Sequence, residues 1–140
     1  MKFLNKYPSI KLKENGLSQG IRVVNYSSPH SYTFHTGEVL PACSDEVARE
    51  TKLEAHHNKT YNDKGWLDVS INYALSELQY KELPELATLD VVDIILVPYP
   101  VMDCLKSYHM DFTTKVLSKI RVCKLHDRVT KVIRSDEFCI

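Results

Sequence analysis

The stretch 66–75 alternates strictly between apolar and polar side chains, and it constrains the fold of this chain more than any other feature. Its apolar positions hold Leu67, Val69, Ile71, Tyr73 and Leu75, and the positions between them hold Asp68, Ser70, Asn72 and Ala74. Side chains of a β-strand point alternately to opposite faces of the sheet, so the pattern predicts a strand with one face buried and one in water. The turn-forming residues 62–65 precede it, so we expect 50–75 to form a hairpin.

The run 91–97 is almost entirely apolar and β-branched, which is typical of a central strand covered on both faces. Pro98 and Pro100 end it, and Pro100 fits the first turn of a following helix. Apolar residues at helical spacing predict that helix and a second, shorter one capped by Asp111. The two helical stripes hold Val101, Leu105 and Tyr108, and then Phe112, Val116, Leu117 and Ile120. We interpret 83–89 as a connector.

The N-terminal part of the chain predicts a polar arm followed by a hairpin. Residues 1–20 are rich in lysine and interrupted by proline and glycine, so we expect a loosely held arm that docks on a partner or on the body. The run 21–26 has the β-branched content of a strand. The cluster 27–30 contains serine and proline and should turn the chain, so that 32–36 returns as a second strand.

The segment 47–55 is open to two interpretations. Its content of Ala, Glu, Lys and Arg favours a helix, which Ser44 or Asp45 would cap. Its pattern favours a strand, because the apolar residues fall on one face and most charged residues on the other. We favour the strand.

Length and composition indicate one domain after the arm. The chain has 140 residues, of which 44% are hydrophobic, and a domain of this size buries roughly two-thirds of the surface of its unfolded chain. Two strands near 120–126 and 129–134 are expected to close the chain. We therefore predict an α+β fold over 21–140, a mostly antiparallel β-sheet with one or two helices inserted before a C-terminal β-hairpin.

Charge and hydropathy exclude several kinds of partner. The 18 basic residues balance 18 acidic ones, which argues against non-specific binding of nucleic acid or membranes. No apolar run is long enough to span a bilayer or to form a secretory signal. We expect a cytoplasmic protein with reduced thiols, in the cytoplasm of the host cell if a phage encodes it. A homo-oligomer is expected, because symmetric pairing is a common way to cover sheet edges.

The histidines are the first candidates for metal ligation or acid–base chemistry. They are His30, His35, His56, His57, His109 and His126. A zinc site needs three or four converging ligands, and adjacent His56 and His57 would point to opposite faces of a strand. No His-Glu-x-x-His motif and no paired cysteines accompany them. We expect no cofactor and no metal, and we keep one alternative, a metal site built from His30, His35, His56 and His57.

Nucleophilic catalysis is not indicated by any local motif, so no catalytic residue is assigned. Cys104 should lie in the helix after the central strand, where the helix dipole would lower the pKa of its thiol slightly. We nevertheless expect a buried, inert thiol. Carboxylate pairs such as Asp136 and Glu137 are typical of solvated turns. The four glycines are not grouped, which excludes a glycine-rich phosphate loop.

The last third of the chain is rich in cations on its predicted hairpin. They are Arg121, Lys124, Arg128, Lys131 and Arg134. Gathered on one face near an aromatic ring, they would suit a phosphate-bearing small ligand through bidentate guanidinium contacts and stacking. The alternative is a charged strand face that only keeps the protein soluble. The candidate ligand-binding residues are Arg121, Lys124, Arg128, Arg134, Tyr99 and Tyr108.

Several stretches resemble a group of small phage and bacterial accessory proteins. These proteins carry Asn-Leu-Thr-Pro-His before a hairpin, then Pro-Ser-Gly-x-x-Ala-Arg, then a Leu-Pro connector and an apolar strand. Similar here are Asn25-Tyr26-Ser27-Ser28-Pro29-His30, Pro41-Ala42-Cys43-Ser44-Asp45-Glu46-Val47-Ala48-Arg49, Leu83-Pro84 and Ile94-Ile95-Leu96-Val97-Pro98. The first motif is one residue longer, and the glycine after Ser44 is missing. The resemblance covers about residues 21–105 and implies a phage accessory protein with no particular reaction.

We therefore expect a non-enzymatic protein that binds and blocks a host component and so inhibits antiviral defence. It would do so by sequestering a phosphate-bearing nucleotide signal or by masking a host protein. One alternative is a small histidine-dependent hydrolase or nuclease, with or without a metal. The other is a structural or assembly subunit, which an exposed apolar edge or patch would indicate.

Overall fold

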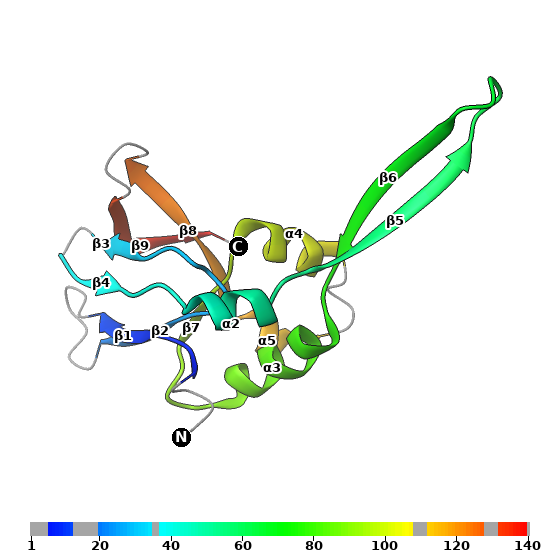
Figure 1. Cartoon of the computed structure of the whole chain (residues 1–140). Helices are drawn as coiled ribbons and strands as arrows, with labels where there is room; N and C mark the ends of the chain where they lie inside the picture. Colours follow the sequence, from blue (N-terminus) through cyan, green and yellow to red (C-terminus); the bar gives the residue numbers. More distant parts are fainter. Residues whose placement is uncertain (1–5, 13–19, 35–36, 108–111, 128–131, 140) are drawn as a thin grey trace.

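The computed structural model describes residues 6–12, 20–34, 37–107 and 112–122 with their side chains, and 123–127 and 132–139 by their backbone. A curled sheet forms one side of the body and helices pack beside it, while a two-stranded hairpin projects away from both (Figure 1). The predicted α+β class is confirmed, including two helices inserted before the C-terminal hairpin.

The large sheet has seven strands in the described residues. They are β1 (Ser9–Leu12), β2 (Ile21–Asn25), β3 (Tyr32–Phe34), β4 (Val39–Leu40), β7 (Ile94–Leu96), β8 (Ile120–Asp127) and β9 (Val132–Cys139). Their spatial order is β1-β2-β7-β8-β9-β3-β4. The central strands β2, β7 and β8 are parallel to one another, as are β9 and β3, and the pairs β1–β2, β8–β9 and β3–β4 are antiparallel. Because β4 at one end contacts β1 and β2 at the other, the sheet curls toward closure.

The helices are α2 (Asp45–Glu50), α3 (Glu77–Thr88), α4 (Tyr99–Ser107) and α5 (Thr114–Leu117). Two cores result. The larger includes Val24 and Ile95 of the sheet with Leu83, Leu86 and Leu105 of α3 and α4. The smaller one consists of Leu12, Val23, Phe34, Leu40 and Leu96. As predicted, β7 is a central strand with neighbours on both sides. The predicted cap Asp111 lies outside the described residues, and Thr113 caps α5.

The preference for a strand over 47–55 was wrong for its first half. Residues 45–50 form α2, because the Ser44 hydroxyl accepts a hydrogen bond from the Val47 amide (3.2 Å). Asp45 and Glu46 then lie in the first turn, where negative charge interacts favourably with the helix dipole. The strand predicted for this segment begins only at Glu54.

The interpretation of 83–89 as a connector was also wrong, since these residues belong to α3. The helix begins with a reciprocal capping box between Ser76 and Gln79. Pro84 lies inside it, although proline usually breaks a helix interior. Leu83 and Leu86 on either side of Pro84 are fully buried in the larger core, and this packing keeps the helix intact.

The predicted hairpin between 21–26 and 32–36 does not form, because β2 pairs with β1 and β7 while β3 pairs with β4 and β9. The buried amide of Asn25 redirects the chain. It donates to the carbonyls of Pro41 (3.0 Å) and Ser28 (3.3 Å), and its oxygen accepts from the Ser28 amide (3.2 Å). Ser27 adopts a left-handed conformation with φ of 80°. The predicted turn forms, but the chain that follows it becomes β3, which lies toward the other end of the curled sheet.

The described part of the predicted N-terminal arm is docked on the body. β1 pairs with β2, and Tyr7 and Leu12 are fully buried. The Tyr7 hydroxyl donates to the buried carboxylate of Glu82, which Lys6 also contacts at 3.1 Å. Burial, followed by the Glu82 hydrogen bond, raises the pKa of Tyr7 above its ordinary value. Burial and the Glu82 charge do the same for Tyr26, whose ring packs against Tyr7.

Among the described residues, no helix combines the length and the apolar character that crossing a membrane requires.

Candidate functional site

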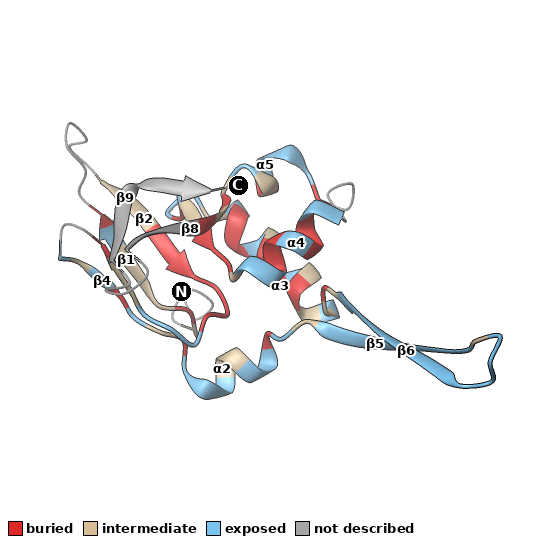
Figure 2. Ribbon diagram, turned by 90° about the horizontal axis from the view of Figure 1, so that it is seen from above, coloured by how far each residue is buried: buried red, intermediate tan, exposed pale blue. Residues whose placement is uncertain are grey.

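The hairpin of β5 (Glu54–Tyr61) and β6 (Leu67–Ala74) is the most exposed part of the described chain, and we call it the arm. The two strands pair antiparallel along their whole length, from Glu54 opposite Ala74 to Tyr61 opposite Leu67. Nearly every residue of both strands is exposed, and Figure 2 shows the arm extending into solvent. The predicted hairpin is confirmed, but the predicted half-burial of 66–75 is wrong, because no other described element packs along the arm.

The register sorts the arm into two chemically distinct faces, since directly opposed residues point to the same side. The apolar face carries Ala55, His57, Lys59 and Tyr61 from β5, with Leu67, Val69, Ile71 and Tyr73 from β6. The polar face carries Glu54, His56, Asn58 and Thr60, with Asp68, Ser70, Asn72 and Ala74. One side of the arm therefore presents a continuous row of large apolar side chains.

The large apolar residues of the arm are far more exposed than is usual for their type. The exposed fractions run from 43% for Leu67 to 78% for Tyr61, with Ile71 at 49% and Tyr73 at 58%. Single exposed apolar residues are normal on a protein surface, but a contiguous group of them marks an interaction site. The apolar face is therefore the candidate functional site.

The tip of the arm is a fixed turn that presents an aromatic ring and a cation. The Asn62 side-chain oxygen accepts hydrogen bonds from the amides of Lys64 (2.9 Å) and Trp66 (3.3 Å). Gly65 has a φ of 84°, which glycine adopts without steric cost. The Lys64 ammonium lies 5.6 Å from the centre of the Trp66 ring, and 59% of Trp66 is exposed.

The two roots of the arm are held together by Gln79, which is fully buried. Its amide nitrogen donates to the carbonyl of Thr51 (2.8 Å), just before β5. Its amide oxygen accepts from the Ser76 backbone nitrogen (2.8 Å), just after β6. The Ser27 hydroxyl also donates to the Thr51 carbonyl (3.1 Å), so the left-handed conformation of Ser27 helps to hold this root. The arm therefore leaves the body in a defined direction.

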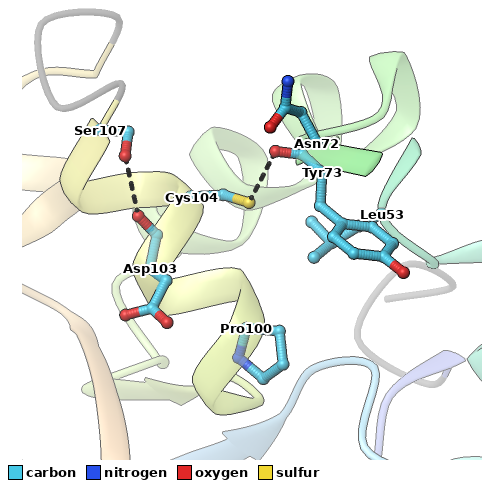
Figure 3. Close-up of a pocket in the computed structure, with 7 residues that line it drawn as sticks. All are labelled: Leu53, Asn72, Tyr73, Pro100, Asp103, Cys104 and Ser107. Atoms are coloured by element: carbon cyan, nitrogen blue, oxygen red, sulfur yellow. Dashed lines mark hydrogen bonds between the residues drawn. The ribbon is translucent and has the colours of Figure 1, made fainter. Parts of the chain in front are cut away.

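A pocket of about 380 Å³ lies where the arm meets α4, and we call it the basal pocket (Figure 3). It is lined by Leu53, Asn72, Tyr73, Pro100, Asp103, Cys104 and Ser107. Figure 3 shows the Tyr73 ring beside Leu53, with Pro100 and Asp103 on the neighbouring helix. The pocket thus combines an apolar wall with one carboxylate at the end of the apolar face.

Cys104 in this pocket is not an activated thiol. Its Sγ donates to the Tyr73 carbonyl at 3.5 Å, which links α4 to the base of β6. Burial raises the pKa of the thiol, and the Asp103 carboxylate raises it further. The slight lowering of the pKa expected from the helix dipole is therefore wrong, whereas the expected burial of the thiol is confirmed.

Of the predicted ligand-binding residues, the structure describes the side chains of only two. Arg121 is half-buried on β8, and its guanidinium donates to the Ile120 carbonyl at 2.8 Å. Tyr99 begins α4 and is 64% exposed. Tyr108 and Arg128 lie outside the described residues, as do the side chains of Lys124 and Arg134. Their grouping around a nucleotide stays a prediction.

The histidines of the alternative metal site lie on two separate features. His30 is an exposed residue of the loop after β2, and His35 lies outside the described residues. His56 and His57 are neighbours on β5 and point to opposite faces of the arm, and His56 contacts Glu54 at 3.7 Å. Within the described ranges, no three histidine, cysteine or carboxylate side chains gather as metal ligands do.

Sequence reasoning did not identify the apolar face as a site, although the signal was present. A half-buried 66–75 would place Ile71 and Val69 in the core, together with the residues opposite them. Those residues are His57 and Lys59, and Lys59 would be costly to bury without a partner. The hairpin register therefore predicts an exposed face, because burying Val69 would also bury Lys59.

Comparison of the chain with protein-family models, curated protein sequences and solved structures found no match.

Proposed function

We propose that this chain is a non-enzymatic binding protein that holds a protein partner on the apolar face of its arm and acts by masking that partner. The observation that carries the proposal is the exposed row of apolar side chains on β5 and β6. Apart from Tyr73 at the base, which lies beside Leu53, these side chains are exposed in the described structure, and an exposed apolar surface of this kind is typical of association sites.

The shape of the site favours a protein over a small molecule. Small ligands are usually bound in concave pockets that cover most of their surface, whereas the apolar face is an extended strip on a projecting hairpin. Eight residues per strand give the strip a length of about 27 Å. A strip of this length fits the flat surface of another protein, and the two free strand edges offer main-chain hydrogen bonds as well.

The biological role we propose follows from the resemblance to phage accessory proteins. Such a protein would bind and block a host component, and antiviral defence is the process we propose that it inhibits. Masking needs no reaction, only a complex that persists, and a buried apolar strip supplies the free energy for one. The basal pocket beside the strip adds specificity, because its Asp103 carboxylate selects for a cationic group on the partner.

A pair of neighbouring substitutions on opposite faces tests the proposal. Ile71→Asp places a charge on the apolar face, and Ser70→Asp places the same charge one residue away on the polar face. Tagged wild-type protein and both variants are used as baits in bacterial lysate, and the bound proteins are quantified by mass spectrometry. We expect wild type and Ser70→Asp to retain the same proteins and Ile71→Asp to lose them. Retention of every partner by Ile71→Asp would show that the arm is not the binding element.

A further inference from the structure

The arm is an unsupported element, and this limits what can cover it. A two-stranded hairpin alone in water is marginally stable at best. In the described part of the chain, the hydrogen bonds that fix this hairpin lie at its roots, where Gln79, Ser27 and Cys104 take part. An apolar strip that is always present on such an element is best covered by something that is always available, and a second copy of the same chain meets that requirement.

The two ends of the arm are complementary to each other. The tip presents the Trp66 ring in a cation–π contact with the Lys64 ammonium. The base presents a pocket whose lining includes Leu53, Pro100 and the acidic residue Asp103. An aromatic ring suits the apolar wall, and a cation suits the carboxylate. Within one chain these groups lie about 27 Å apart, the length of the arm, so they can meet only between two chains.

We infer that the apolar face packs antiparallel against the apolar face of a second copy, with the tip of each arm in the basal pocket of the other. The inference rests on the proposed function, because it concerns the same apolar face, and a host protein that binds this face has to displace the second copy. A two-fold axis across the middle of the arm produces this arrangement. Both tip-to-base contacts then form at once, because a two-fold interface is self-complementary.

The antiparallel arrangement also matches the side chains along β6, and on β5 it places His57 of one copy against Lys59 of the other. It places Ile71 of one copy against Val69 of the other, and Tyr73 against Leu67, so that apolar side chains meet along β6. Ala55, a small residue, faces Tyr61, a large one. Lys59 lies on β5, an outer edge of the hairpin, and its long aliphatic stem allows the ammonium to reach water there.

The area available is close to what a stable dimer needs. Six large apolar side chains on the arm are 43% to 78% exposed. At about 100 Å² each they offer about 600 Å² per copy, given that aromatic side chains alone can bury 150 Å² or more. A standard interface buries roughly 800 Å² per partner. Five side chains of the apolar face and Trp66 at the tip therefore supply most of this area, and the walls of the basal pocket that receive the tip supply the rest.

The first test is the concentration dependence of association, because Trp66 is the single tryptophan of the chain. Sedimentation velocity gives the mass, and tryptophan emission reports directly on burial of the tip. We expect a monomer–dimer equilibrium in which emission shifts to the blue as the dimer forms. Ile71→Asp should weaken dimerisation by roughly a hundredfold or more, since each substitution acts at both symmetric contacts. The matched variant Ser70→Asp should dimerise like wild type.

The second test is a charge exchange between tip and base. Lys64→Glu and Asp103→Lys should each weaken dimerisation by roughly tenfold, because two exposed ion pairs are replaced by like charges. The double variant should recover most of the wild-type affinity, since the pair is restored with its signs exchanged. Both residues are exposed, so neither substitution disturbs the core.

The outcomes separate this inference from the proposed function. A chain that stays monomeric at every concentration overturns the second-copy assignment, as does a dimer indifferent to Ile71→Asp. Additive losses in the Lys64→Glu and Asp103→Lys double variant overturn the antiparallel arrangement. If the chain is monomeric but Ile71→Asp still loses a foreign protein in the lysate experiment, the proposed function stands with a different partner. If Ile71→Asp changes neither association nor capture, both proposals fail.

Discussion

Gln79 joins the two roots of the arm, and its replacement by alanine should be among the most destabilising single changes outside the apolar core. The side chain is fully buried and makes two hydrogen bonds of 2.8 Å, to the Thr51 carbonyl and from the Ser76 amide. In Gln79→Ala the Ser76 amide loses its partner, and the Thr51 carbonyl keeps only the hydroxyl of Ser27.

Three contributions give the magnitude for Gln79→Ala. Loss of the capping hydrogen bond leaves the Ser76 amide unsatisfied, which costs about 1 to 2 kcal/mol. Loss of the hydrogen bond to the Thr51 carbonyl costs about another 1 kcal/mol. The space left by the removed side chain costs roughly another 0.5 kcal/mol. The sum is about 3 kcal/mol, which lowers Tm by about 10 °C for a chain of this length.

Denaturant unfolding followed by circular dichroism measures this loss, and Ser76→Ala is the matched control. That variant removes only the hydroxyl that accepts from the Gln79 amide (3.3 Å), so it should cost about 1 kcal/mol. Gln79→Ala should also make the arm more sensitive to limited proteolysis, because both roots are loosened. A loss for Gln79→Ala no larger than that for Ser76→Ala would refute the assignment of Gln79 as the joint of the arm.

Two further predictions concern pH and the C-terminal cations. Because the pKa values of Tyr7 and Tyr26 are raised in the folded state, their contribution to stability is complete below about pH 10 and is lost as pH rises further. The free energy of unfolding, measured with denaturant at each pH, should fall by up to about 2.7 kcal/mol per pH unit, and Tyr7→Phe should halve that slope. If the chain sequesters a nucleotide signal on its last two strands, replacing Arg121, Arg128 and Arg134 with alanine should abolish binding of cyclic oligonucleotides in calorimetry while Tm is kept. Unchanged affinity in that triple variant would remove nucleotide sequestration as a function.

The sequence predicted those elements whose formation depends on neighbouring residues in the chain. The β-branched run of β7 and the proline pair after it gave a central strand followed by a helix, as the structure has them. α3 was missed, because 83–89 was interpreted as a connector although Ser76 and Gln79 form the capping box that begins the helix. The pairing of β2 with β7 could not be foreseen, since it joins residues far apart in sequence and depends on the redirecting turn at Asn25.

The candidate site was predicted only in part, for a physical reason. Alternation over 66–75 reports the chemistry of two strand faces, but it does not report what covers them. The same pattern is found in a strand whose apolar face packs on the protein's own core and in a strand whose apolar face binds another molecule. The basal pocket was beyond sequence reasoning, because Leu53, Tyr73 and Asp103 come from three separate segments. Their meeting depends on how α4 packs at the root of the arm.

The most direct test of the account is the emission of Trp66 across a wide dilution series of the unmodified chain, recorded together with Ile71→Asp. The account predicts a blue-shifted spectrum at high concentration that moves to the red on dilution, while Ile71→Asp stays red throughout. A spectrum independent of concentration and identical in both proteins would mean that the tip is never buried by a second copy. The central claim about the arm would then be contradicted.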